Sequence, residues 1–169
     1  LAYDQIIEAI ERGEIRGLWV VATNPAHSWI DQDRFTRLRQ KLEFLVVQDM
    51  YATTETAKMA DLVLPATSSL QRHDLGGSPR ARYVIAMHRA IDPVGEARSD
   101  YEIMAGLAKR LGFEDKFTEG KSEMDWLRSF YDQAQKAAKP LDVPMMDFDT
   151  FWNGPGYVEF PIPDDAKNF

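Results

Sequence analysis

Helix-like and strand-like patterns of hydrophobic positions alternate along the first part of the chain. Apolar residues at helical spacing over Tyr3–Arg12 predict a first helix. The apolar run Ile15–Ala22 is rich in branched and aromatic residues and too short for a capped helix, so it predicts a strand buried on both faces. Ser28, with Asp31 three residues later, is typical of a helix N-cap and predicts a second helix that ends near Lys41.

The same alternation then repeats. A bare apolar strand is expected over Phe44–Val47, ending in Gln48-Asp49, and Thr53 or Thr54 can cap a short helix that follows it. Asp61–Pro65 predicts a third strand, which the proline stops. Strands that alternate with helices are typical of an α/β fold, so we expect a Rossmann-like, doubly wound and mainly parallel sheet with helices on both faces.

The second half of the chain changes character toward its end. Tyr83–Met87 predicts a fourth strand, and helical spacing predicts a helix over Asp100–Leu111. Ser122 with Asp125 is typical of a helix N-terminus and predicts a further helix that runs to Ala134. Prolines and aromatic residues dominate the last segment and predict an extended aromatic arm. We therefore expect a domain over residues 1–139 and an arm over 140–169 that leads to a further domain.

Composition narrows the class of protein. The 169 residues, 44% of them hydrophobic, are enough for one folded domain with a core. The formal net charge of −7 gives no electrostatic footprint for a nucleic acid. The absence of cysteine excludes a disulfide, a zinc-thiolate site, an iron–sulfur cluster and a cysteine nucleophile within this chain. No apolar run is long enough to predict a membrane span.

Polar residues follow each of the first three predicted strands. They are Thr23-Asn24, Gln48-Asp49 and Thr67-Ser68. Ligands of open parallel sheets bind at the carboxyl ends of the strands, so these residues are candidates for a binding site. The Asp49 carboxylate can accept two hydrogen bonds from the ring N–H and amino group of a guanine, which adenine cannot match. Asp49 could equally cap the helix that begins near Thr53, and Asn24 before a proline could simply form a turn.

Other chemistry is weakly supported. Arg72 and Arg80 follow the third strand and could pair with a phosphate, although solvated arginines are commoner. The chain has no glycine-rich dinucleotide fingerprint, no P-loop, no zinc-ligand spacing among its histidines and no Gly-x-Ser-x-Gly elbow. The residues alone therefore indicate a ligand-binding α/β domain of unspecified chemistry.

Three ordered segments carry a resemblance to a known family. They are GEIRGLWVVATNPAHSWIDQDR (13–34), FLVVQDMYATTETAKMADLVLPATS (44–68) and AIDPVGEARSDYEIMAGLAKRLG (90–112). Together they resemble the third domain of the molybdopterin oxidoreductases, the dimethyl sulfoxide reductase family. Residues 117–133 and 148–160 are similar to dimethyl sulfoxide, trimethylamine N-oxide and biotin sulfoxide reductases in particular. TNPAHS and VVQDMYATTETA are closer to nitrate reductases and formate dehydrogenases.

The resemblance implies a role in holding a cofactor. Relatives use this domain for the guanosine end of one molybdopterin guanine dinucleotide of the bis-pterin molybdenum cofactor. The positions that match nucleotide contacts in relatives are Asn24, Gln48, Asp49, Arg72 and Asp100, and Thr53 matches a position near the ribose or base. The family's metal ligand has no counterpart in this chain, so the resemblance implies no catalytic residue here.

The resemblance also implies that the chain is a fragment of a larger reductase subunit that is inactive alone. The implied parent reduces an S-oxide or N-oxide by two-electron oxygen-atom transfer in anaerobic respiration, fed by an electron-donor protein. The implied partners are the other domains of the parent, and the compartment is the periplasm for such a reductase and the cytoplasm otherwise. Trp152 and Phe160 are expected to be exposed in the isolated piece. The alternatives are a fragment of a nitrate reductase or formate dehydrogenase, and a free-standing nucleotide-binding or interaction module.

Overall fold

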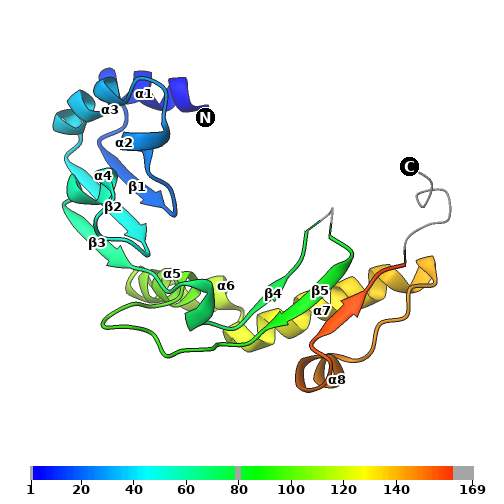
Figure 1. Cartoon of the computed structure of the whole chain (residues 1–169). Helices are drawn as coiled ribbons and strands as arrows, with labels where there is room; N and C mark the ends of the chain where they lie inside the picture. Colours follow the sequence, from blue (N-terminus) through cyan, green and yellow to red (C-terminus); the bar gives the residue numbers. More distant parts are fainter. Residues whose placement is uncertain (1, 79–80, 162–169) are drawn as a thin grey trace, which may run out of the picture. The chain divides into compact units, whose positions relative to one another are not determined.

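The structure is a computed structural model that describes residues 2–78 and 81–161 (Figure 1). The chain divides into two compact units. The first unit holds the residues up to Thr67 together with Val94–Asp100, and the second holds Ser68–Pro93 and the chain from Tyr101 onward. Each unit is described by itself.

The first unit contains a parallel sheet of three strands. These are β1 (Gly17–Val21), β2 (Phe44–Asp49) and β3 (Leu62–Pro65), in the order β1-β2-β3. A parallel bridge between Ala66 and Arg98 extends the pairing just past the end of β3. The three predicted strands and their parallel arrangement are confirmed.

One helix precedes these strands, and short helices connect them. They are α1 (Tyr3–Glu11), α2 (Pro25–Ser28), α3 (Gln32–Leu38), the 3₁₀ turn η1 (Arg39–Lys41) and α4 (Glu55–Lys58). The prediction that Ser28 caps one long helix is wrong. Pro25 starts α2 in its first turn, the Ser28 hydroxyl donates back to the Asn24 carbonyl at 3.0 Å, and the Asp31 side chain accepts from the Arg34 amide as the N-cap of α3.

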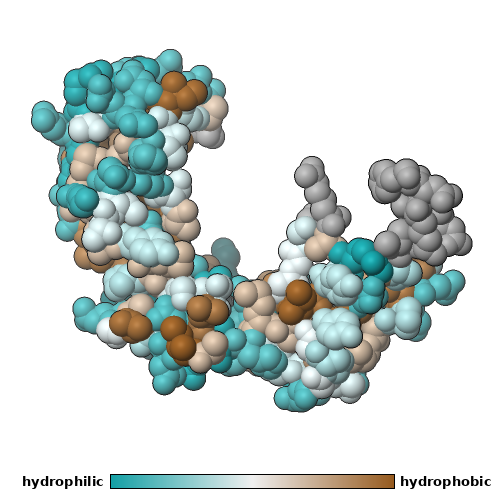
Figure 2. Space-filling view, in the orientation of Figure 1, coloured by the Kyte–Doolittle hydropathy of each residue, from teal (hydrophilic) through white to brown (hydrophobic). Residues whose placement is uncertain are grey.

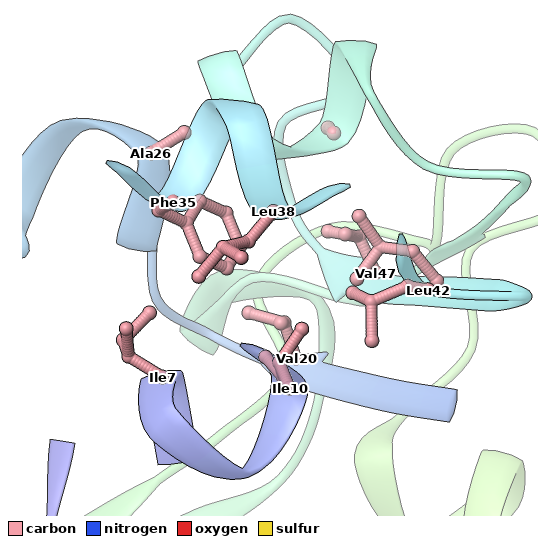
Figure 3. Close-up of a cluster of buried hydrophobic side chains, with 10 residues drawn as sticks. Ile7, Ile10, Val20, Ala26, Phe35, Leu38, Leu42 and Val47 are labelled. Carbon is pink, nitrogen blue, oxygen red and sulfur yellow. The ribbon is translucent and has the colours of Figure 1, made fainter. Parts of the chain in front are cut away.

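The hydrophobic core of the first unit lies between these helices and one face of the sheet (Figure 3). Alternate residues of β2, Leu45 and Val47, pack there with Ile7, Ile10 and Phe35. The strands follow one another in chain order, and α1 and α3 contribute Ile7, Ile10 and Phe35 to the core on this face. Figure 2 shows a largely hydrophilic surface over α1 and α3, as expected for the outer side of amphipathic helices.

The second unit contains an antiparallel sheet with the order β4-β5-β6. Its strands are β4 (Asp74–Gly76), β5 (Tyr83–Met87) and β6 (Tyr157–Glu159). The predicted strand over Tyr83–Met87 exists, but it belongs to this sheet and is not a fourth parallel strand. The connection from β4 to β5 is too short for the crossover that a parallel pair requires.

The helices of the second half include the predicted ones. They are η2 (Ser69–Gln71), α5 (Asp100–Arg110), α6 (Glu114–Thr118), α7 (Glu123–Ala138), η3 (Lys139–Leu141) and α8 (Phe148–Asn153). Ser122 and Asp125 form the predicted capping box of α7, with the Asp125 amide 3.2 Å from the Ser122 hydroxyl. None of the helices in the described ranges is long and apolar enough to cross a membrane.

The C-terminal segment has more structure than the extended arm we expected. Residues of α8 and β6 join α7 in a second core, in which the rings of Tyr131 and Phe151 stack at 4.4 Å. Trp152 is only 9% exposed, so the expectation of an exposed Trp152 is wrong, because α8 packs this indole into the core. Phe160 is half-buried, and residues 162–169 lie outside the described residues.

Candidate functional site

The carboxyl ends of the three parallel strands lie side by side. Backbone hydrogen bonds join them in sequence: Ala22 N to Gln48 O at 2.9 Å, Ala66 N to Asp49 O at 3.0 Å and Thr67 N to Arg98 O at 3.0 Å. We call this region the carboxyl edge and define it as residues 22–24, 48–53, 65–67 and 98–100. Of the positions that match nucleotide contacts in relatives, it contains Asn24, Gln48, Asp49, Thr53 and Asp100, whereas Arg72 belongs to the second unit.

Asp49 ends β2 at the centre of the carboxyl edge. Its side chain is largely buried, with 9% of the residue exposed, and its Oδ1 accepts a hydrogen bond from the Tyr51 amide at 3.0 Å. Within the described chain Oδ2 has no hydrogen-bond partner. The alternative that Asp49 caps the next helix is wrong, because Thr54 accepts from the Ala57 amide there. Asp49 instead forms a local turn that fixes its carboxylate.

Gln48 connects the carboxyl edge to Asp100. Gln48 is 1% exposed, and its Nε2 donates to Asp100 Oδ1 at 2.5 Å. Asp100 is exposed, and the segment before it is held by the backbone pairing with β3. The structure therefore links two predicted site residues that are 52 positions apart in the chain.

Asn24 lies at the carboxyl edge, but both ends of its amide contact the protein. Its Oδ1 accepts from the Thr56 amide at 3.1 Å and from the Thr56 hydroxyl at 2.7 Å, and its Nδ2 donates to Glu55 Oε2 at 2.6 Å. The hydrogen bond from Asn24 lowers the pKa of the Glu55 carboxyl below its usual value. Asn24 thus ties the end of β1 to the start of α4.

Sequence reasoning missed Thr56 and Glu55. Thr56 is fully buried, and its hydroxyl also accepts from the Ala26 amide at 3.0 Å. The available signal was the position of Thr56, two residues after Thr54 in the segment 44–68. The local pattern predicts Thr53 or Thr54 as a helix cap, but it does not predict that the Thr56 side chain reaches the end of β1.

The remaining candidates differ in position. Thr53 is exposed in the turn before α4, within the carboxyl edge. Arg72 belongs to the second unit, where its guanidinium pairs with Asp74 at 3.1 Å. Arg80 lies outside the described residues. Among the residues that the structure describes, no group of three or more His, Cys, Asp or Glu side chains could hold a metal ion.

The side chains of the carboxyl edge favour a ligand rich in hydrogen-bond donors. Asp49 and Asp100 both present carboxylates, which accept hydrogen bonds and donate none when ionised. Guanine offers adjacent N–H donors on one edge and matches such a carboxylate in a two-point contact. The residues present therefore fit the guanine end of a nucleotide better than its phosphates.

Comparison with known proteins places this α/β architecture in one family. The sequence model described as Molybdopterin oxidoreductase matches residues 2–110, which is more than half of the chain. The chain belongs to the molybdopterin oxidoreductase family, whose cofactor is a molybdopterin.

The relatives include several S-oxide and N-oxide reductases. The chain is 46% identical over 146 residues to the dimethyl sulfoxide/trimethylamine N-oxide reductase of Cereibacter sphaeroides, covering 85% of the chain and 18% of that protein. It is 39% identical over 153 residues to a biotin sulfoxide reductase of the same organism, covering 90% and 20%. It is 40% identical over 139 residues to the trimethylamine-N-oxide reductase of Vibrio cholerae, covering 81% and 17%. The chain thus spans about a fifth of the length of these relatives.

A solved structure supports the fold. Acetylene hydratase from Pelobacter acetylenicus matches with a TM-score of 0.64 and 19% sequence identity, covering 94% of this chain and 21% of that chain. At this identity the match bears on the fold alone. The predicted α/β class and the predicted family are therefore both confirmed.

Proposed function

We propose that the carboxyl edge binds the guanosine end of a molybdopterin guanine dinucleotide. The observation that carries this proposal is the Asp49 carboxylate, which is largely buried, oriented by the Tyr51 amide and left with Oδ2 unpartnered within the described chain. A guanine ring N–H and amino group can each donate to this carboxylate. Each such charge-assisted hydrogen bond, where buried, stabilises the complex by about 1.5–3 kcal/mol.

The other predicted residues take supporting roles in this proposal. Asp100 adds a second carboxylate at the same edge, and Thr53 supplies an exposed hydroxyl for the ribose or base. Asn24 shapes the loop after β1, because both ends of its amide are already occupied by the protein. Arg72 belongs to the second unit, where it pairs with Asp74, so it is not part of the site proposed here.

The parent activity is also a proposal, since the chain spans about a fifth of its relatives. We propose that the chain is one domain of a larger subunit that reduces an S-oxide or N-oxide, as the names of its relatives suggest. A bis-molybdopterin guanine dinucleotide would supply the two-electron oxygen-atom transfer, and the other domains would complete its binding site. This chain would contribute the placement of one nucleotide end.

Substitution of Asp49 tests the proposal. Asp49→Asn in the complete protein replaces one carboxylate oxygen with an amide donor, which opposes a guanine donor. We expect the affinity for the nucleotide end to fall by about tenfold to a hundredfold. The measurement is the guanine and molybdenum content of the purified protein, with the exposed Asp33→Asn on α3 as a matched control. Normal guanine content in Asp49→Asn would refute the assignment.

A further inference from the structure

Gln48 is a buried polar residue of β2 that directly follows the apolar run Leu45–Val47. It is 1% exposed, whereas Asp100, to which its Nε2 donates at 2.5 Å, is exposed. Its other amide atom, Oε1, is buried and has no hydrogen-bond partner in the described part of the chain. A buried polar atom left without a partner destabilises a fold, so its presence calls for a compensating role.

The hydrogen bond to Asp100 fixes which way the Gln48 amide faces. Only the NH₂ group of the amide can donate to a carboxylate, and a rotation of the amide by half a turn would place Oε1 against Asp100 Oδ1. Two acceptors at that separation repel each other. The buried Oε1 is therefore the consequence of directing the donor toward Asp100.

The backbone near Asp100 is already held without Gln48. Arg98 donates its amide to the Pro65 carbonyl at 3.1 Å and accepts from the Thr67 amide at 3.0 Å, which fixes this segment beside β3. The Gln48 amide is the side-chain contact that orients the Asp100 carboxylate on this fixed backbone. Burial also prevents Gln48 from touching a ligand that enters from solvent.

We infer that Gln48 is a positioning residue, which holds the Asp100 carboxylate in the orientation that the guanosine end requires. This inference rests on the proposed function. It changes the expected role of Gln48 from a nucleotide contact to a buried donor that acts through Asp100.

Gln48→Met in the complete, cofactor-loaded protein separates positioning from folding. Methionine has a similar volume and removes both the donor to Asp100 and the unpartnered oxygen. We expect the midpoint of urea unfolding to stay equal or rise, while the rate of guanine nucleotide release increases at least about tenfold. Gln133→Met, on the exposed face of α7, is the matched control and should change neither quantity.

Gln48→Glu gives a second test through pH. Two carboxylates at this separation cannot both be ionised, so they share a proton and the pKa of the pair rises. The shared proton restores a hydrogen bond to Asp100 at low pH. We expect slow, wild-type-like nucleotide release near pH 5 and release at least about tenfold faster near pH 8, with no such dependence in Gln48→Met.

Measuring Asp49→Asn together with Gln48→Met distinguishes the positioning role of Gln48 from the proposed binding of the guanosine end. Faster release from Asp49→Asn with normal release from Gln48→Met would overturn the positioning role and leave the proposed function intact. Normal release from both variants would overturn the proposed function itself. If Gln48→Met both lowers the midpoint of urea unfolding and speeds nucleotide release, the role of Gln48 is purely structural. That result would also overturn the inference.

Discussion

At the residue scale, Asn24 is a side chain of the carboxyl edge whose observed contacts are all within the protein. Its position after β1 predicted either a ligand contact or a turn, and the structure adds a third role. Its amide joins Thr56 and Glu55, which lie more than 30 positions later in the chain. No sequence pattern predicts a partner at that distance, because the pairing depends on where the strands place their ends.

The Thr56 hydroxyl is the centre of this network and gives a stability prediction. Thr56→Val keeps the shape of the side chain but leaves the Ala26 amide and Asn24 Oδ1 without this partner. We expect the free energy of unfolding to fall by about 1–3 kcal/mol, because Thr56 is fully buried. Urea unfolding of the chain at pH 7 measures the loss.

Thr36→Val on α3 is the control for Thr56→Val. The Thr36 hydroxyl is exposed and bonds only within its own helix, to the Gln32 carbonyl. We expect a change within about 0.5 kcal/mol at this surface position. Equal effects of the two substitutions would contradict the role given to Thr56.

At the element scale, the long periodic helix α7 was predictable, whereas the short elements α8 and β6 were not. The apolar spacing and the Ser122-Asp125 pair predicted α7, and the structure confirms both. In contrast, α8 has six residues and β6 has three, which are too few for a helical or alternating pattern to stand out. Asp147 was the missed signal for α8, since its side chain accepts from the Thr150 amide as an N-cap.

The contact between α7 and the segment before α8 gives a pH prediction. Tyr131 is 1% exposed and donates its hydroxyl to the Met146 carbonyl at 2.9 Å. Burial raises the pKa of Tyr131 to about 12, above its ordinary value near 10. The stability contributed by the neutral phenol is therefore complete below about pH 10 and is lost as the pH rises through about 12.

Tyr131→Phe removes both the hydrogen bond to Met146 and the group that ionises at alkaline pH. At pH 7 the variant should lose about 1 kcal/mol of unfolding free energy, because Gln135 still donates to the Met146 carbonyl. Between pH 10 and 12 its stability should decline less steeply than that of the wild type. Urea unfolding across this pH range is the measurement, with the exposed Tyr157→Phe as control, and parallel alkaline declines in wild type and Tyr131→Phe would contradict the account.

At the scale of the whole molecule, the family was predictable from the sequence, whereas the division of the chain into two units was not. Ordered motifs predicted the molybdopterin oxidoreductase family, and the family match confirms it. The rule that parallel strands present ligand residues at their carboxyl ends points to Gln48 and Asp49 from the sequence, and both residues lie at the end of β2. The two units were not predicted because residues 94–100 belong to the first unit although residues 68–93 before them belong to the second. Local sequence patterns do not show which distant segments pack together.

The central claim is that the Asp49 carboxylate accepts hydrogen bonds from the guanine of a molybdopterin guanine dinucleotide. Its most direct test is an experimental structure of the complete protein with its cofactor bound. The account predicts the guanine ring N–H and amino nitrogens at about 2.7–3.2 Å from the two Asp49 carboxylate oxygens. A guanine whose nitrogens all lie farther than about 4 Å from that carboxylate, with no hydrogen bond to it, would contradict the claim.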